Sequence, residues 1–152
     1  MRTLWQKLRS LFSRSGSSVQ NADPARHRSL GELGEDEAVR FLKSLGYRIL
    51  ARQMRNSFGE IDIIAEDGKV IVFVEVKTRS DESGGKPWEA VNQKRQERMT
   101  RAALAWLKKT RRLDRSARFD VISILWPDVS QPANITHFPR AFDAQGRGQM
   151  FR

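Results

Sequence analysis

One unbroken apolar run that ends in charged residues constrains this chain more than any other feature. The segment "KVIVFVEVKTR" (69–79) contains five consecutive apolar residues and continues into Glu75 and Lys77 without interruption. An apolar run of this length, rich in Val, predicts a strand that is buried on both faces. The segment "EIDIIAE" (60–66) has the same character and carries Asp62 in its interior. Both strands therefore place an acid where burial is expected.

A turn signal joins the two strands into a hairpin. Asp67-Gly68 stands between them, and Asp-Gly favours a two-residue hairpin turn. If these two residues form the turn, Glu60 lies opposite Glu75, and residues directly opposite each other share a face of the sheet. Because side chains also alternate along each strand, four charged side chains are expected to project from one face: Glu60, Asp62, Glu75 and Lys77.

Carboxylates that face one another across a hairpin repel each other, and burial increases the cost. A divalent cation removes this repulsion, because Mg²⁺ binds through one or two carboxylates and keeps other positions for water and substrate oxygens. The alternative is a set of ion pairs at the strand edge, in which Lys77 neutralises Glu75. The position of the acids on adjacent apolar strands of a basic protein favours a metal site.

These residues resemble the signature of the PD-(D/E)xK nuclease superfamily, with Asp62, Glu75 and Lys77 in its three places. The chain is more closely similar to the YraN family, which is related to the archaeal Holliday-junction resolvases. The resemblance runs from about Gly31 to Phe142 through "GELGEDEA", "LGYRIL", "GEIDIIA", "VFVEVKTR", "RFDVI" and "AF". Ile61 stands where the superfamily usually has Pro, which changes little because Asp62 supplies the oxygen ligand.

The resemblance implies a metal-dependent endonuclease that hydrolyses phosphodiester bonds in DNA, including branched or single-stranded DNA. Asp62 and Glu75, with the backbone carbonyl of Val76, would hold Mg²⁺ or Mn²⁺, and Lys77 would orient the attacking water. In the resolvase-like relatives a Glu lies eleven positions before a helix-ending Gly, which implies that Glu35 reaches the metal directly or through water. An exposed Glu stabilised by the helix N-terminus is the alternative reading of that residue. A catalytically silent nucleic-acid-binding protein of the same fold is the alternative function.

The order of the predicted elements indicates an α/β domain with a mixed sheet of about five strands flanked by helices. The resemblance specifies a restriction-endonuclease-like fold for this domain, which spans residues 29–143 between a basic tail (1–28) and a C-terminal tail (144–152). The expected elements are a helix from Ser29 to Gly46, strands at 47–52, 60–66, 69–79, 117–125 and 135–142, a loop at 55–59, and a helix from Pro87 to about Arg112.

The charge of the chain predicts an anionic partner. There are 28 Lys and Arg residues against 18 Asp and Glu, which gives a net charge of +10 and favours nucleic acid or an acidic membrane surface. Within the helix predicted from Pro87, Lys94 belongs to a basic stripe, whereas Arg95 falls among apolar positions, so its head is expected to reach the carboxylates. A solvated face and a snorkelling Arg are the alternatives. The residues expected to contact nucleic acid are Arg79, Lys94, Arg95, Arg98 and Arg101.

Several further expectations concern location and assembly. The sequence has no Cys, which excludes disulfides and fits a cytoplasmic protein. No apolar run approaches the roughly 20 residues that span a bilayer, so integral membrane association is not expected. The tail at 1–28 holds six Lys and Arg residues and one acid, and both an amphipathic helix and a loosely ordered tail remain open. Because the resolvase relatives act as dimers, a homodimer is a further expectation.

Overall fold

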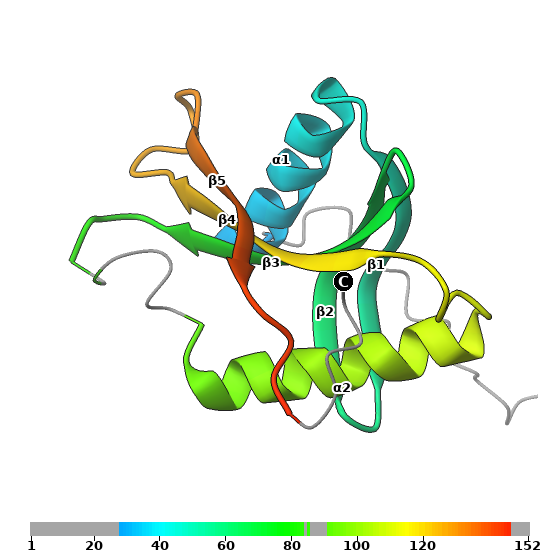
Figure 1. The fold of residues 1–152 in the computed structure, drawn as a ribbon. Helices are drawn as coiled ribbons and strands as arrows, with labels where there is room; N and C mark the ends of the chain where they lie inside the picture. The colour runs from blue at the N-terminus through cyan, green and yellow to red at the C-terminus, as the bar shows by residue number, and fades with distance from the viewer. Residues whose placement is uncertain (1–27, 84, 86–90, 147–152) are drawn as a thin grey trace, which may run out of the picture.

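The computed structural model describes residues 28–83, 85 and 91–146 (Figure 1). All but Arg28 of the predicted tail at 1–28, and most of the tail at 144–152, therefore lie outside the described residues. The elements follow in the order α1 (Leu30–Ser44), β1 (Arg48–Asn56), β2 (Gly59–Asp67), β3 (Val70–Arg79), α2 (Gln93–Lys109), β4 (Ala117–Leu125) and β5 (Asn134–Phe142). No helix in these parts of the chain is long and apolar enough to cross a lipid bilayer.

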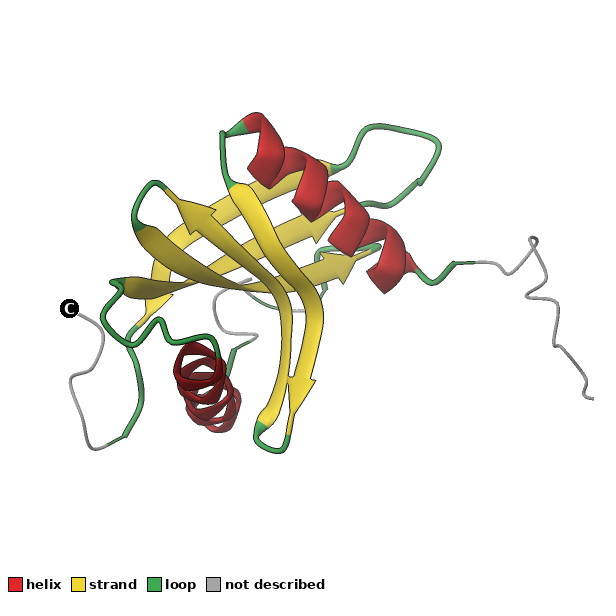
Figure 2. Cartoon of the chain, turned by 90° about the vertical axis from the view of Figure 1, so that its right-hand side faces the viewer, coloured by secondary structure: helices red, strands yellow, loops and turns green. Residues whose placement is uncertain are grey.

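The five strands form one mixed sheet in the order β1-β2-β3-β4-β5. Strands β3 and β4 are parallel, and the other neighbouring pairs are antiparallel. The parallel pair needs a crossover connection, which contains α2. Figures 1 and 2 show α1 and α2 on opposite faces of this strongly twisted sheet. The predicted α/β architecture is confirmed, and it is consistent with a restriction-endonuclease-like fold.

Strand β3 lies at the centre of two apolar layers. Ile71 and Phe73 pack into the layer beneath α2, together with Met99 and Leu107 of that helix. Val72 and Val74 pack into the other layer, against α1. All four of these β3 side chains have no solvent exposure. The prediction that the continuous apolar run forms a strand buried on both faces is therefore confirmed.

The first helix begins where the sequence predicts. The Ser29 side chain accepts a hydrogen bond from the backbone N–H of Glu32, and the Glu32 carboxylate accepts one from the Ser29 N–H, which forms a capping box. At the other end, Gly46 has a φ of +87° just beyond the C-cap, a conformation that Gly adopts without steric cost. These two local signals fix the ends of α1.

The second helix starts later than predicted. It begins at Gln93, since the Asn92 side chain accepts a hydrogen bond from the Arg95 N–H and caps the helix there. The prediction that this helix starts at Pro87 is therefore wrong. Pro87 itself lies outside the described residues. The helix also ends early, at Lys109, and Arg111 follows with a φ of +57°.

The loop predicted at 55–59 is mostly strand. Strand β1 continues to Asn56 and β2 starts at Gly59, so only Ser57 and Phe58 form the turn. Sequence alone favoured a loop there because Asn, Ser and Gly dominate the segment. The two strands extend the sheet, and their turn lies beside α2 (Figures 1 and 2).

The turn between β2 and β3 also differs from its prediction. Asp67 pairs with Val70, so the turn residues are Gly68 and Lys69 rather than Asp67 and Gly68. Gly68 takes the left-handed conformation, with a φ of +58°. The pairing register is therefore shifted by two residues from the predicted one. A shift by two keeps every side chain on its predicted face, because the side-chain period of a strand is two.

Candidate active site

The corrected register brings the two central acids together at the point where β2 and β3 separate. The paired residues of this hairpin end at Ile63 and Val74, and the next positions in the same register are Asp62 and Glu75. Beyond this point the Asp62 side chain takes the place of a backbone partner: its Oδ2 accepts a hydrogen bond from the Val76 N–H at 2.7 Å. The carboxylate thus fills the gap between the diverging strands.

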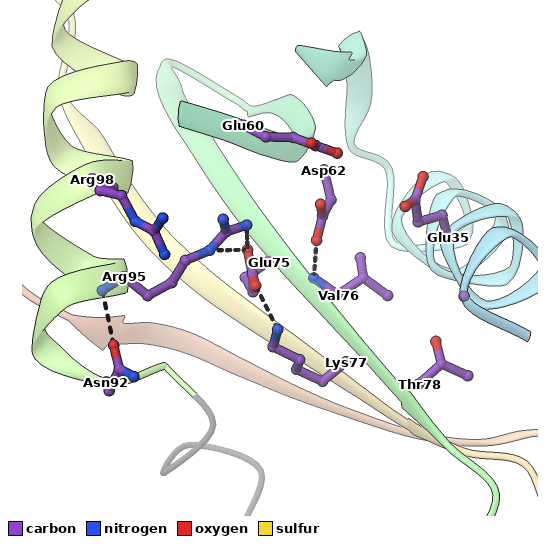
Figure 3. A pocket seen from close by; sticks show the side chains of 11 residues that line it. Glu35, Glu60, Asp62, Glu75, Val76, Lys77, Thr78, Asn92, Arg95 and Arg98 are labelled. Atoms are coloured by element: carbon purple, nitrogen blue, oxygen red, sulfur yellow. Dashed lines mark hydrogen bonds and ion pairs between the residues drawn. The ribbon is translucent and has the colours of Figure 1, made fainter. Parts of the chain in front are cut away.

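A polar cavity of about 550 Å³ opens at this divergence, and we call it the acid–base pocket (Figure 3). Side chains from α1, β2, β3 and α2 meet in it, so it is built from elements that are far apart in sequence. The residues that line it are Gly31, Glu35, Glu60, Asp62, Glu75, Val76, Lys77, Thr78, Asn92, Arg95 and Arg98. The pocket therefore contains all the metal-binding and catalytic residues that the resemblance implies: Glu35, Asp62, Glu75, Val76 and Lys77.

Glu75 is the most deeply buried acid of the pocket, with a side chain that is 1% exposed. Two cations hold it. The Lys77 Nζ lies 2.8 Å from Oε1, and the Arg95 guanidinium donates to Oε2 through Nη2 at 2.6 Å and Nε at 3.2 Å. A buried carboxylate needs such partners, because an unpaired charge in this position is strongly destabilising. The Arg95 guanidinium therefore reaches the Glu75 carboxylate, as its position in the helix predicted.

Asp62 has weaker compensation than Glu75. Burial and the neighbouring Glu75 carboxylate raise the pKa of Asp62 from 3.8 to about 7, although the Val76 N–H opposes the shift. The two acids of the pocket therefore differ: Glu75 is ion-paired twice, and Asp62 is close to half protonated near neutral pH. A bound cation would stabilise the ionised form of Asp62 and lower its pKa, in competition with the proton.

Glu35 enters the pocket from α1 and adds to the rise in the pKa of Asp62. Its Oε2 accepts a hydrogen bond from the Gln53 Nε2 at 2.9 Å. Gln53 has a φ of +46° within β1, a conformation that is rare for residues other than Gly and costs about 1–3 kcal/mol. Sequence analysis missed Gln53, because nothing in the sequence marks a left-handed residue inside this strand.

The donor set of the pocket suits a cation that takes few protein ligands. Among the described residues, no three side chains of His, Cys, Asp or Glu lie close enough together to hold a metal ion. Asp62 and Glu75 offer two carboxylates, and Mg²⁺ commonly binds through one or two and keeps several waters. Glu35 sits across the pocket, where contact through a water fits better than direct ligation. The residues present therefore fit Mg²⁺ or a similar hard cation.

A close contact between α1 and β3 sets the position of Glu35. A Cβ atom added to Gly34 would lie 2.8 Å from Cβ and 2.9 Å from Cγ2 of Thr78. The Thr78 hydroxyl is buried and has no hydrogen-bond partner within the described part of the chain. Only Gly allows the helix to approach the strand this closely, and the next residue on the helix is Glu35.

Replacing Gly34 by Ala should lower the free energy of unfolding by about 1–3 kcal/mol, because the added methyl group overpacks the contact with Thr78. The matched control is Gly31→Ala in the same helix, where the new Cβ would meet only the Ser29 Oγ at 3.9 Å. That change should stabilise the protein by up to about 1 kcal/mol. Urea denaturation measures both. Equal stability of the two variants would show that the contact does not constrain α1.

The remaining basic residues lie around the pocket in different ways. Arg98 lines it, and Lys94 and Arg101 are exposed on α2. Arg79 donates to the Gly85 carbonyl at 2.6 Å. Glu60 lines the pocket and pairs with Arg55 at 3.0 Å. The structure therefore brings Arg95 and Arg98 into the pocket and leaves the other predicted contacts outside it.

A second buried polar cluster lies on the α1 face of the sheet. Asp120 has no solvent exposure and pairs with Arg118 at 3.0 Å and with His137 at 2.8 Å. Arg118 also donates to the Tyr47 hydroxyl at 2.7 Å. Burial alone raises the pKa of Asp120, but the hydrogen bonds from His137 and Arg118 outweigh it and lower the pKa. None of these residues lines the acid–base pocket, so this cluster is separate from the candidate active site.

The fold and the pocket together define an α/β domain of restriction-endonuclease-like fold in which acids and bases meet where two central strands diverge. The sequence model described as "Uncharacterised protein family UPF0102" matches residues 34–124. This chain belongs to the UPF0102 family. UPF0102 is the YraN family, so the resemblance found in the sequence is confirmed.

Relatives within this family match most of the chain. The UPF0102 protein of Geotalea daltonii is 50% identical over 117 residues, which cover 77% of this chain and 91% of the relative. That of Geotalea uraniireducens is 48% identical over 125 residues, or 82% and 98% of the two chains. That of Rhodopirellula baltica is 38% identical over 149 residues, or 95% and 86%. These names give the family and no activity.

Proposed function

We propose that this protein is a metal-dependent endonuclease that hydrolyses phosphodiester bonds in DNA. The observation that carries the proposal is the pair of buried acids, Asp62 and Glu75, which meet beside Lys77 and Arg95 in one pocket. Buried carboxylates that face each other destabilise the fold, and sites with perturbed titration in a cleft are typical of functional centres. The net charge of +10 supports a polyanionic substrate.

Asp62, Glu75 and the Val76 carbonyl would hold Mg²⁺ or Mn²⁺, with Glu35 in contact through water. When bound, such a cation polarises a phosphoryl oxygen and makes a bound water more acidic. Asp62 contributes most strongly when it is ionised, so its pKa of about 7 predicts higher activity on the alkaline side of neutrality at limiting metal concentration.

The cationic residues divide the remaining tasks. Lys77 is placed to donate a hydrogen bond to an attacking water and to offset negative charge that develops on the phosphate. Arg95 and Arg98 project into the pocket from α2 (Figure 3). A guanidinium presents several N–H donors in a plane, which suits the recognition of phosphate oxygens. We assign phosphate binding to these two arginines.

A nucleic-acid-binding protein that does not cut is the second candidate. It is favoured by the two ion pairs on Glu75, which keep that acid compensated without a metal. The two functions differ in their need for a cation: a binding protein holds DNA equally well in EDTA, whereas the endonuclease produces fragments only with a divalent metal.

The decisive experiment uses labelled linear duplex, flapped, four-way and single-stranded DNA, each incubated with Mg²⁺, with Mn²⁺ and with EDTA. The endonuclease should cut at least one substrate with a metal and none in EDTA. The Asp62→Asn variant, purified in parallel, excludes a contaminating nuclease. Binding without cleavage under every condition would establish the second candidate in place of the first.

Arg95→Ala should reduce cleavage far more than Lys94→Ala, on the order of 10²-fold, because Arg95 contacts Glu75 inside the pocket. Lys94 is the matched control, since it precedes Arg95 in the same helix and is exposed. Its loss should mainly lower the slope of log affinity against log salt by about one. Single-turnover rates and a salt titration of binding measure the two effects. Equal, small losses of rate would remove Arg95 from the active site.

A further inference from the structure

The turn between β1 and β2 carries one of the most exposed aromatic side chains in the described part of the chain. Phe58 is 47% exposed and occupies the second position of the two-residue turn. A single exposed apolar residue is common on protein surfaces and needs no function by itself. Phe58 differs from such a residue because hydrogen bonds tie its turn to α2 and because the turn lies near the acid–base pocket.

The turn is fixed firmly to α2. The Asn56 Oδ1 accepts a hydrogen bond from the Phe58 N–H at 3.0 Å, and the Asn56 Nδ2 donates to the Ala102 carbonyl of α2 at 3.0 Å. One side chain therefore shapes the turn and ties it to the helix. Gly59 packs against the same helix, and a Cβ there would lie 3.7 Å from the Arg98 Cβ. Phe58 is thus held on a rigid support although its side chain faces solvent.

The support stands at the edge of the acid–base pocket. Gly59 lies beside Arg98 and is followed directly by Glu60. Both Arg98 and Glu60 line the pocket. Phe58 lies four residues from Asp62 along the chain, which is about 13 Å in an extended strand. The rise along the axis of a stacked strand is about 3.4 Å per nucleotide, so this distance corresponds to at most about four nucleotides and to fewer in an unstacked strand.

Two arginines near the turn can meet a polyanion. Arg98 and Arg101 are exposed on the adjacent part of α2, whereas Arg55 at the end of β1 is exposed but pairs with Glu60. An exposed aromatic ring on a tethered turn, beside arginines and next to the proposed phosphate-binding pocket, has the composition of a surface that binds unpaired nucleobases by stacking. A continuous duplex offers such a ring only its ends, because its bases are already stacked in pairs.

We propose that Phe58 stacks on an unpaired nucleobase of the same strand whose phosphodiester group lies in the acid–base pocket. The inference rests on the proposed function, because that function places the nucleic-acid strand in the acid–base pocket. It narrows the substrate to nucleic acid that exposes unpaired bases within a few nucleotides of the bond that is cut. Phe58 is a specificity-determining residue in this reading, and it takes no part in the chemical step.

The test measures the affinity of the full chain for a labelled single-stranded oligonucleotide and for the blunt duplex of the same sequence, by fluorescence anisotropy in EDTA at fixed salt. Phe58→Ala should weaken binding of the single strand by about 5- to 100-fold and change duplex binding much less. Phe58→Trp should retain the affinity. Phe58→Leu should behave like the Ala variant, because it keeps apolar bulk and lacks an aromatic face.

Val129→Ala is the control, since Val129 is 55% exposed and lies between β4 and β5, and it should bind both ligands as the wild-type protein does. Wild-type affinity in the Leu variant would show that Phe58 only packs, and would overturn the inference. Equal weakening for single strand and duplex in the Ala variant would also overturn it. A metal-dependent enzyme does not cleave in EDTA, so these affinities test the role of Phe58 separately from the proposed function. The proposed function fails if no substrate is cut with a metal.

Discussion

Replacing Asp62 by Asn should abolish cleavage, and replacing Glu75 by Gln should do the same. Each change removes one of the two buried carboxylates that can hold a divalent cation, and the amide that replaces it is a weaker, neutral ligand. The loss should exceed that of any other single substitution, because metal binding and every later event at the phosphate depend on these two groups. Initial rates at saturating Mg²⁺ with the most readily cut substrate measure it.

The Asp62→Asn variant should also be more stable than the wild-type protein at about pH 8 in EDTA. Because burial and Glu75 raise the pKa of Asp62 from 3.8 to about 7, the folded protein retains a proton in this interval that the unfolded chain loses. The free energy of unfolding therefore falls as pH rises from about 4 to about 7, on the order of 1–4 kcal/mol. Urea denaturation between these pH values should show the fall in the wild type and its absence in the variant.

Glu66→Gln is the matched control for both measurements. Glu66 lies on the same strand, is also buried and pairs with Arg48 and Arg115 outside the pocket. Its pKa is lowered, chiefly by the hydrogen bonds from these two arginines, so its loss should reduce stability at neutral pH and leave cleavage intact. If Asp62→Asn and Glu75→Gln fold and retain wild-type turnover, the metal site is assigned wrongly.

The sequence predicted the composition of the pocket better than its register. Asp67-Gly68 is a strong turn signal, yet the turn uses Gly68 and Lys69. The error shifted the pairing by two residues and left the acids on the correct face, because faces repeat with the same period. Only the structure shows that Asp62 and Glu75 occupy facing positions where the strands separate. That separation is a property of the whole sheet and has no local signal.

The parts of the pocket that sequence analysis missed arise from contacts between distant segments. Gln53 supports Glu35 from β1 through a left-handed backbone conformation, and neither the residue type nor its neighbours predict it. The close contact of Gly34 with Thr78 joins α1 to β3, and a Gly inside a helix is not by itself informative. Arg95 was predicted because a local signal existed: a charged residue stood among apolar helix positions, which demands a partner.

Lys77→Ala should remove most of the cleavage rate, about 10²–10⁴-fold, with a much smaller change in DNA affinity. The Lys77 Nζ contacts the Glu75 Oε1 at 2.8 Å, and its side chain is 34% exposed toward the pocket. It can therefore meet both the acids and a bound phosphate. Arg95 continues to pair with Glu75 when Lys77 is removed, so the fold should survive and the loss should appear in the chemical step.

Rate and affinity must be measured separately to decide what Lys77 does. Single-turnover rates at saturating protein report the chemical step, and anisotropy in EDTA reports binding. Lys69→Ala is the control, because Lys69 is an exposed lysine at the distant turn of the same hairpin, and its loss should change neither quantity strongly. A Lys77→Ala variant that loses rate and affinity by the same factor would mark Lys77 as a phosphate contact that binds the ground state and the transition state equally. Loss of rate alone means that its ammonium group acts only as the phosphodiester bond breaks.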